Sequence, residues 1–306
     1  MKTPFVLVLL VLSACGSPGY DSTNTIANSM LIFGTVEQVN VSLSSQACNA
    51  ALAQILPLYD SVNTNNQIRL ATAASYGCAA KVNIFQVLSD MTKASNLGGS
   101  GLWKFLAGEF PSVASPDDKM PTAAGLGTDA AMAAVGDGTL IVPTVKINAT
   151  SHNPGSLILG DRITDANSYI TFLSMSLMGS LLYRDGRPNA TTLVKTVPLP
   201  WQTAPTAVGN GCAFAAALLN FFDGLDAITG ASPATIQASY KVISSFLTTG
   251  VNTACGLGCS LICGGASTCT SCPTTLRDRN SCTGLTTDAN SCAAAGLAAF
   301  VSSSWI

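Results

Sequence analysis

The sequence predicts a mainly α-helical body whose C-terminal third combines loops with helices and is rich in disulfides. Apolar residues recur three and four positions apart over most of the chain, which is the period of one face of an α-helix. Eleven cysteines occur, and eight of them lie between residues 212 and 292. With 306 residues, the chain is long enough to bury the core of one large domain or of two ordinary ones.

The N-terminal half is expected to consist of helices separated by polar turns. A helical pattern begins at residue 26, and an Asn-rich turn at 63–66 separates it from a second long helix over 68–91. After a Gly-rich break, a short apolar segment covers 102–110 and an Ala-rich helix covers 123–138. The apolar positions of the first pattern are Ile26, Met30, Phe33, Val36, Val39, Ala47, Ala51, Ile55 and Leu58.

The rest of the chain continues this scheme with one exception. Residues 139–147 are the best candidate for a strand, although Pro143 would restrict it to a sheet edge. A helix over 165–183, with its apolar residues on one face, precedes a Pro-bearing connection at 197–205. Three further helices are expected over 211–222, over 233–247 (with Ser232 as N-cap and Pro233 at the first position) and over 293–306.

The first fifteen residues have the layout of an export signal. Lys2 supplies a positive charge, residues 5–12 form a short apolar run, and the run ends in Leu12-Ser13-Ala14-Cys15. This motif resembles the lipobox of bacterial lipoproteins, in which signal peptidase II cuts before the cysteine and the thiol carries a diacylglycerol. The resemblance covers these residues alone and implies a mature chain that begins at Cys15 and is anchored in a membrane by its acyl chains. An ordinary signal peptide with an unrelated cysteine is the alternative reading.

The lipobox and the helical pattern together divide the chain into four parts. We expect a lipoprotein signal peptide at 1–14, a lipidated tether at 15–25, a helical N-terminal region at 26–200 and a Cys-rich helical C-terminal region at 201–306. Gly16 stands where enteric lipoproteins that stay at the inner membrane tend to have Asp. The outer membrane or the cell surface is therefore favoured over the inner membrane. An apolar C-terminal tail also suits a glycosylphosphatidylinositol signal, but its spacer is poor and the lipobox argues against it.

The composition excludes some classes of partner. Only 10% of the residues are charged, and the formal net charge is −2, so the chain has no basic patch suited to nucleic acid. The mean hydropathy is high, at +0.40, which raises the question of a membrane span. The best candidate, residues 206–222, contains Asn210 and Asn220 and is shorter than the roughly 20 apolar residues that a spanning helix needs. The sequence therefore predicts a lipid anchor without a span.

An exported chain with an even number of cysteines predicts structural disulfides. Cys48 and Cys78 stand apart from the others, on two helices that a short turn should place side by side. Cys255, Cys259 and Cys263 would share one helical face, so each is expected to link its segment to another one. Setting Cys15 aside, the disulfide candidates are Cys48, Cys78, Cys212, Cys255, Cys259, Cys263, Cys269, Cys272, Cys282 and Cys292.

The C-x-x-C spacing of Cys269 and Cys272 also occurs in thiol oxidoreductases and in zinc sites. The motif lies in a loop-like context with Pro273, and no strand–helix alternation surrounds it. A zinc site would need a second pair at matching spacing, or histidine, and His152 is the one histidine in the chain. Structural disulfides are therefore favoured, and we expect no metal and no cofactor.

Candidates for catalysis are few. His152 with Asp161 or Asp165 could form part of a hydrolytic triad, but no G-x-S-x-G elbow presents a nucleophile. Two carboxylate pairs remain for glycosidase-like chemistry or cation binding. These pairs are Asp117 with Asp118 in a Pro-flanked loop, and Asp223 with Asp226 three positions apart on a helix.

The sequence thus predicts a lipid-anchored envelope protein with a structural or binding role, without assigned catalytic residues. Its partners would be the membrane, through the lipid on Cys15, and an envelope or host-surface protein. An envelope hydrolase with an unrecognised site is one alternative. An accessory protein that carries apolar cargo between helices is another. A large apolar cavity would favour cargo, whereas a solid core with a flat Ser/Thr-rich face would favour contact with a protein.

Overall fold

A computed structural model describes residues 22–61, 65–94, 97–112, 120–135, 162–202, 210–228, 234–258, 272–277, 282 and 288–306. All regular secondary structure in these residues is helical, which confirms the predicted fold class. The helices are α2 (Ser22–Ser44), α3 (Cys48–Ser61), α4 (Asn66–Ala79), α5 (Ile84–Lys93), α6 (Ser100–Glu109), α7 (Met120–Val135), α8 (Arg162–Gly186), η1 (Pro200–Gln202), α9 (Asn210–Ile228), α10 (Ala234–Leu257), η4 (Thr274–Arg277) and α11 (Ala289–Ser304). The expected strand at 139–147, and Ser232 and Pro233, lie outside the described residues.

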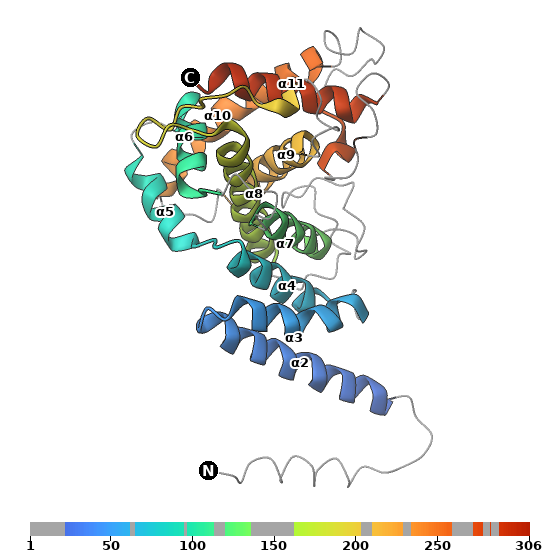
Figure 1. Ribbon diagram of the computed structural model, residues 1–306. Coiled ribbons are helices and arrows are strands. Elements are labelled where there is room, and N and C mark those ends of the chain that lie inside the picture. The colour runs from blue at the N-terminus through green and yellow to red at the C-terminus, as the bar shows by residue number, and fades with distance from the viewer. Residues whose placement is uncertain are drawn as a thin grey trace.

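Helices α2, α3 and α4 form a layer at the end of the molecule that lies opposite α11 (Figure 1). Helix α2 begins at Ser22, so the predicted tether at 15–25 overlaps its first turn. The first helical pattern divides into α2 and α3 at Gln46, whose φ of 58° is left-handed. The N–H of Ala47 donates to the carbonyl of Ser42 at 2.8 Å, the hydrogen bond that closes a Schellman turn.

The prediction of a single long helix over 68–91 is wrong, because the structure has two helices there, α4 and α5. Lys81 has a φ of 57°, and the N–H of Val82 donates to the carbonyl of Gly77 at 2.9 Å. This is a second Schellman turn. The Asn83 side chain then caps α5 by accepting the N–H of Gln86 at 3.1 Å.

Helix α8 runs through the middle of the body, where α4, α6, α7 and α9 contact it (Figure 1). Every residue from 170 to 182 is buried, including Thr171, Ser174, Ser176 and Ser180. The predicted one-sided helix is therefore buried all round. The side of α8 predicted to face solvent carries small residues, and these allow neighbouring helices to pack closely. For example, a Cβ on Gly179 would lie 2.3 Å from the carbonyl oxygen of Leu106 in α6.

Helices α9, α10 and α11 complete the body at the other end. The ring of Trp103 from α6 packs against Phe246 of α10 and Phe300 of α11, with centroids 5.7 and 6.0 Å apart. Asp288 caps α11 by accepting the N–H of Ser291 at 2.7 Å. Helix α10 extends ten residues beyond the predicted end at 247. Of the helices described, none is long and apolar enough to cross a membrane.

Three disulfides join described cysteines, which confirms the disulfide-rich character of the C-terminal third. Cys48 is bonded to Cys78, Cys212 to Cys282, and Cys255 to Cys272. Cys292 is disulfide-bonded as well. Cys255 links α10 to another segment, as its position on the helix suggested. Cys15, Cys259, Cys263 and Cys269 lie outside the described residues.

Candidate functional site

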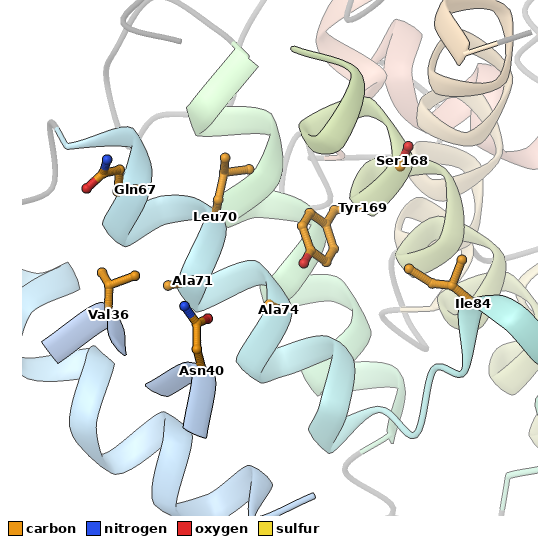
Figure 2. Close-up of a pocket in the computed structure, with 9 residues that line it drawn as sticks. All are labelled: Val36, Asn40, Gln67, Leu70, Ala71, Ala74, Ile84, Ser168 and Tyr169. Carbon is orange, nitrogen blue, oxygen red and sulfur yellow. The ribbon is translucent and has the colours of Figure 1, made fainter. Parts of the chain in front are cut away.

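Two hollows open in the layer formed by α2, α3 and α4, and both are almost free of charge. The smaller has a volume of about 320 Å³ and lies where α2, α4, α5 and α8 meet. Figure 2 shows its lining residues, which are Val36, Asn40, Gln67, Leu70, Ala71, Ala74, Ile84, Ser168 and Tyr169. We call it the α2–α8 pocket.

Local sequence signals orient the polar groups of the α2–α8 pocket. Asn65 caps α4, because its side-chain oxygen accepts the N–H groups of Gln67 and Ile68 at 2.8 and 3.2 Å. This cap fixes the first turn of α4, from which Gln67 reaches the pocket. The amides of Asn40 and Gln67 and the phenol of Tyr169 provide donors and acceptors without charge. Such a lining suits a small neutral molecule, and among the described lining residues there is no nucleophile paired with a base.

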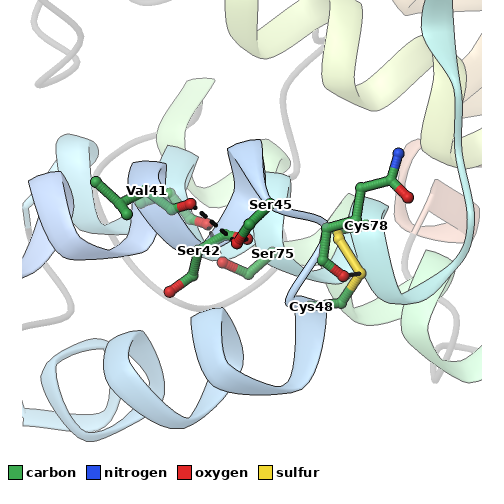
Figure 3. The surroundings of a disulfide bond; sticks show 8 residues. Val41, Ser42, Ser45, Cys48, Ser75 and Cys78 are labelled. Carbon is green, nitrogen blue, oxygen red and sulfur yellow. Dashed lines mark hydrogen bonds between the residues drawn. A yellow bond between two sulfur atoms is a disulfide. The ribbon is translucent and has the colours of Figure 1, made fainter.

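The larger hollow is a groove of about 870 Å³ beside the Cys48–Cys78 disulfide. Figure 3 shows this disulfide between the first turn of α3 and the last turn of α4, near Ser42 and Ser45 at the end of α2. The two left-handed residues that end α2 and α4, Gln46 and Lys81, both line the groove. We call it the disulfide groove.

The walls of the disulfide groove are mainly apolar. Leu52 of α3, Tyr76 of α4 and Leu126 of α7 provide the large side chains, and alanines fill the spaces between them. Lys81 is the one charged residue among the described lining residues. The volume lies within the range of ligand pockets, roughly 300–1,000 Å³. The groove therefore suits an apolar ligand better than a charged one.

Titratable groups with shifted pKa values lie away from both hollows. Burial raises the pKa of Glu109, and the negative charge of Asp90 adds to this increase. Burial lowers the pKa of Lys195, whose Nζ donates to the carbonyl oxygens of Ser302 and Trp305 at 2.7 and 2.5 Å. Neither group lines the α2–α8 pocket or the disulfide groove.

Sequence reasoning missed two polar clusters that hold the fold. Asp185 accepts the indole N–H of Trp201 at 2.7 Å and the amide N–H of Asn210 at 2.9 Å. It thereby joins the end of α8 to η1 and to the start of α9. Arg69 of α4 is fully buried, and its Nη1 donates to Asn66 at 3.1 Å. The two partners of Asp185 are 16 and 25 residues away along the chain, so no local pattern marks it, whereas Asn66 precedes Arg69 by only three residues on the same helix.

The outer side of α10 carries several exposed hydroxyl side chains beside the exposed Lys241 and Val242. Ser245, Thr248, Thr249 and Thr253 are exposed on it. Thr248 donates to the carbonyl of Ser244 at 2.8 Å, and Thr253 donates to that of Thr249 at the same distance. The hydroxyls of Thr248, Thr249 and Thr253 thus bond to carbonyls of their own helix.

Most of the predicted catalytic candidates cannot be placed. His152, Asp117, Asp118 and Asp161 lie outside the described residues, as does the side chain of Asp165. The backbone places Asp223 and Asp226 together on α9, as their spacing predicted. Their side chains are outside the described set.

The metal and redox alternatives gain no support. No group of three or more His, Cys, Asp or Glu residues in the described part of the chain could hold a metal ion. Cys272 is bonded to Cys255 and not to Cys269, its neighbour in the C-x-x-C motif, so this motif does not form the disulfide of a thiol oxidoreductase here. In comparisons with known proteins, this chain matches no protein-family model, no curated protein and no solved structure.

Proposed function

We propose that this chain is a lipid-anchored protein of the bacterial cell envelope, acylated on Cys15, with a binding or structural role. The observation that carries the proposal is the run of Lys2, apolar residues 5–12 and Leu12-Ser13-Ala14-Cys15. Disulfides support it, because they persist in oxidising compartments outside the cytoplasm. The outer membrane or the cell surface is the proposed location, and an envelope or host-surface protein is the proposed partner.

A binding role is favoured over catalysis by the character of the described surface. The exposed hydroxyls of α10 offer hydrogen-bonding groups for contact with another protein, and Lys81 is the one charged residue among the described residues that line the two hollows. Contact through such surfaces would not depend on electrostatic steering, which the low content of charged residues makes weak.

The anchor is tested by the intact mass of the protein purified from its native membrane and alkylated without reduction. The expected mass is that of a chain beginning at Cys15 with acyl groups and with no alkylated thiol. Cys15→Ser is expected to abolish the acyl mass and to release the protein from the membrane fraction. An unlipidated wild-type protein would contradict the proposal, and alkylated thiols at Cys269 or Cys272 would favour redox or metal chemistry instead.

The disulfide groove supports a second candidate function, the binding of an apolar molecule. Filling the groove by Ala50→Trp, on an exposed residue that lines it, is expected to weaken binding of the neutral fluorescent probe N-phenyl-1-naphthylamine about tenfold, or 1.4 kcal/mol. Thr253→Trp on the outer face of α10 is the matched control and should leave binding unchanged. Equal affinities for the two variants would show that the groove is not the binding site.

A further inference from the structure

Helix α2 exposes several large apolar side chains on its outer side. Met30, Phe33 and Val41 are 53%, 64% and 68% exposed, and Leu31 beside them is 56% exposed. On the remainder of the described surface, such side chains are scattered. Contiguous exposed apolar residues mark a surface that contacts a partner or a membrane.

The exposed residues of α2 are aligned along the helix. Phe33, Gly34 and Val41 follow Met30 by three, four and eleven positions, which places all four on one side of an α-helix. We call these four residues the outer stripe. The opposite side of α2 is occupied, because Val39 lies in a buried cluster with Ala51, Ile55, Ile68 and Ala71 of α3 and α4. Helix α2 thus has apolar residues on two opposite sides, and only one of these sides packs against other described helices.

The middle of the outer stripe is open. A Cβ built on Gly34 would have no atom within 4 Å. In Figure 1, α2 is the outermost helix of the end layer, and α3 and then α4 lie above it, toward the body. A flat surface could therefore approach the stripe without meeting the other described helices.

The position of the stripe in the chain indicates what covers it. This step rests on the proposed anchor at Cys15. Residues 16–21 separate Cys15 from Ser22 at the start of α2, and this length of chain spans at most about 25 Å. A lipid on Cys15 would hold α2 within that distance of the bilayer.

The charges on α2 indicate the kind of contact. The helix contains no Lys or Arg, and its one acidic residue, Glu37, is exposed and lies within the stripe, seven positions after Met30. Attraction to anionic headgroups therefore cannot drive the contact, and burial of apolar side chains must do so. We infer that the outer stripe of α2 rests on the surface of the bilayer that holds the Cys15 lipid, with Met30, Phe33 and Val41 inserted among the headgroups.

The inference is tested by fluorescence quenching with the full lipidated protein. Phe33→Trp is reconstituted into phosphatidylcholine vesicles with brominated acyl chains, which quench only a tryptophan that enters the bilayer. The three native tryptophans, Trp103, Trp201 and Trp305, are fully buried, so the wild-type protein gives the background. Phe85→Trp on α5 is the control, because Phe85 is 86% exposed but lies on another helix.

The expected result is that Phe33→Trp loses most of its added fluorescence in brominated vesicles, in low and in high salt, while Phe85→Trp does not. Equal emission of Phe33→Trp in brominated and plain vesicles would overturn the inference. If a dimer then appeared with increasing concentration in detergent, a second copy of the chain would be the partner of the stripe. The acyl mass of the same samples separates the two proposals: acylated protein without quenching contradicts the stripe alone, and absence of acylation contradicts the anchor.

Discussion

Replacing Cys212 and Cys282 together by serine is expected to lower the free energy of unfolding by about 4.4 kcal/mol. This disulfide closes a loop of 70 residues, the longest of the three described. Without it, the unfolded chain regains the conformations that the loop excludes, and the entropy gained grows with loop length. Among the described residues between α10 and α11, Leu276 is the one apolar side chain that is fully buried, so packing offers little compensation there.

Urea unfolding of the oxidised protein measures this effect. Cys48→Ser with Cys78→Ser is the comparison, because its loop of 30 residues predicts a smaller loss, about 3.6 kcal/mol. In the presence of reductant, wild-type protein and both variants should unfold at nearly the same urea concentration. A difference that survives reduction would show that serine itself, and not the loss of the cross-link, destabilises the fold.

Gly296→Ala is expected to destabilise the protein by about 3 kcal/mol. A Cβ at this position would lie 2.1 Å from the carbonyl oxygen of Ala254 and 2.8 Å from the Cα of Gly258. Both are backbone atoms of the segment that α11 packs against, so no side-chain rotation can relieve the overlap. Helices α10 and α11 would have to move apart, which would loosen the contact of Phe300 with Phe246.

The matched control is Gly34→Ala, where the added methyl group has open space. Because alanine favours a helix over glycine by about 1 kcal/mol, this variant is expected to be slightly more stable than the wild type. The urea midpoints of the two variants should therefore shift in opposite directions. A stable Gly296→Ala protein would show that the described approach of α10 and α11 is not as close in solution.

Several helices could be predicted because their signals are local. Apolar residues three and four positions apart mark the helix at 165–183 within a few residues of α8, and the Ala-rich helix expected at 123–138 lies within a few residues of α7. The apolar segment at 102–110, which the sequence does not assign to a helix, forms most of α6. The break between α4 and α5 could not be predicted in this way. It depends on a left-handed Lys81, and lysine carries no sequence signal for that conformation, unlike glycine.

The burial of α8 was decided by its neighbours. Ser174, Ser176 and Ser180 suggest a face turned to water, but α6, α7 and α9 surround the helix and bury all three. Small hydroxyl side chains permit this, since they take up little space. Ser180 bonds to the carbonyl of Leu177 on its own helix, whereas the hydroxyls of Ser174 and Ser176 are buried without a hydrogen-bond partner among the described residues.

Among the cysteines, too, one pairing could be predicted from the sequence and the others could not. The pairing of Cys48 with Cys78 could be expected because only a short turn separates their helices. Eight cysteines in the C-terminal third allow 105 connectivities, and only the packing of α9 and α10 selects Cys212 with Cys282 and Cys255 with Cys272.

By itself, the sequence determined the helical class and the abundance of disulfides, and it carries the lipobox-like motif that ends at Cys15, because each depends on residues that are neighbours along the chain. The tertiary structure alone decided where the disulfide groove opens, which partners Asp185 binds and which side of α2 stays uncovered. The physical reason is that helical periodicity arises from contacts three and four residues apart. Hollows, buried polar bonds and open faces arise instead from helices that are distant in sequence and meet in space.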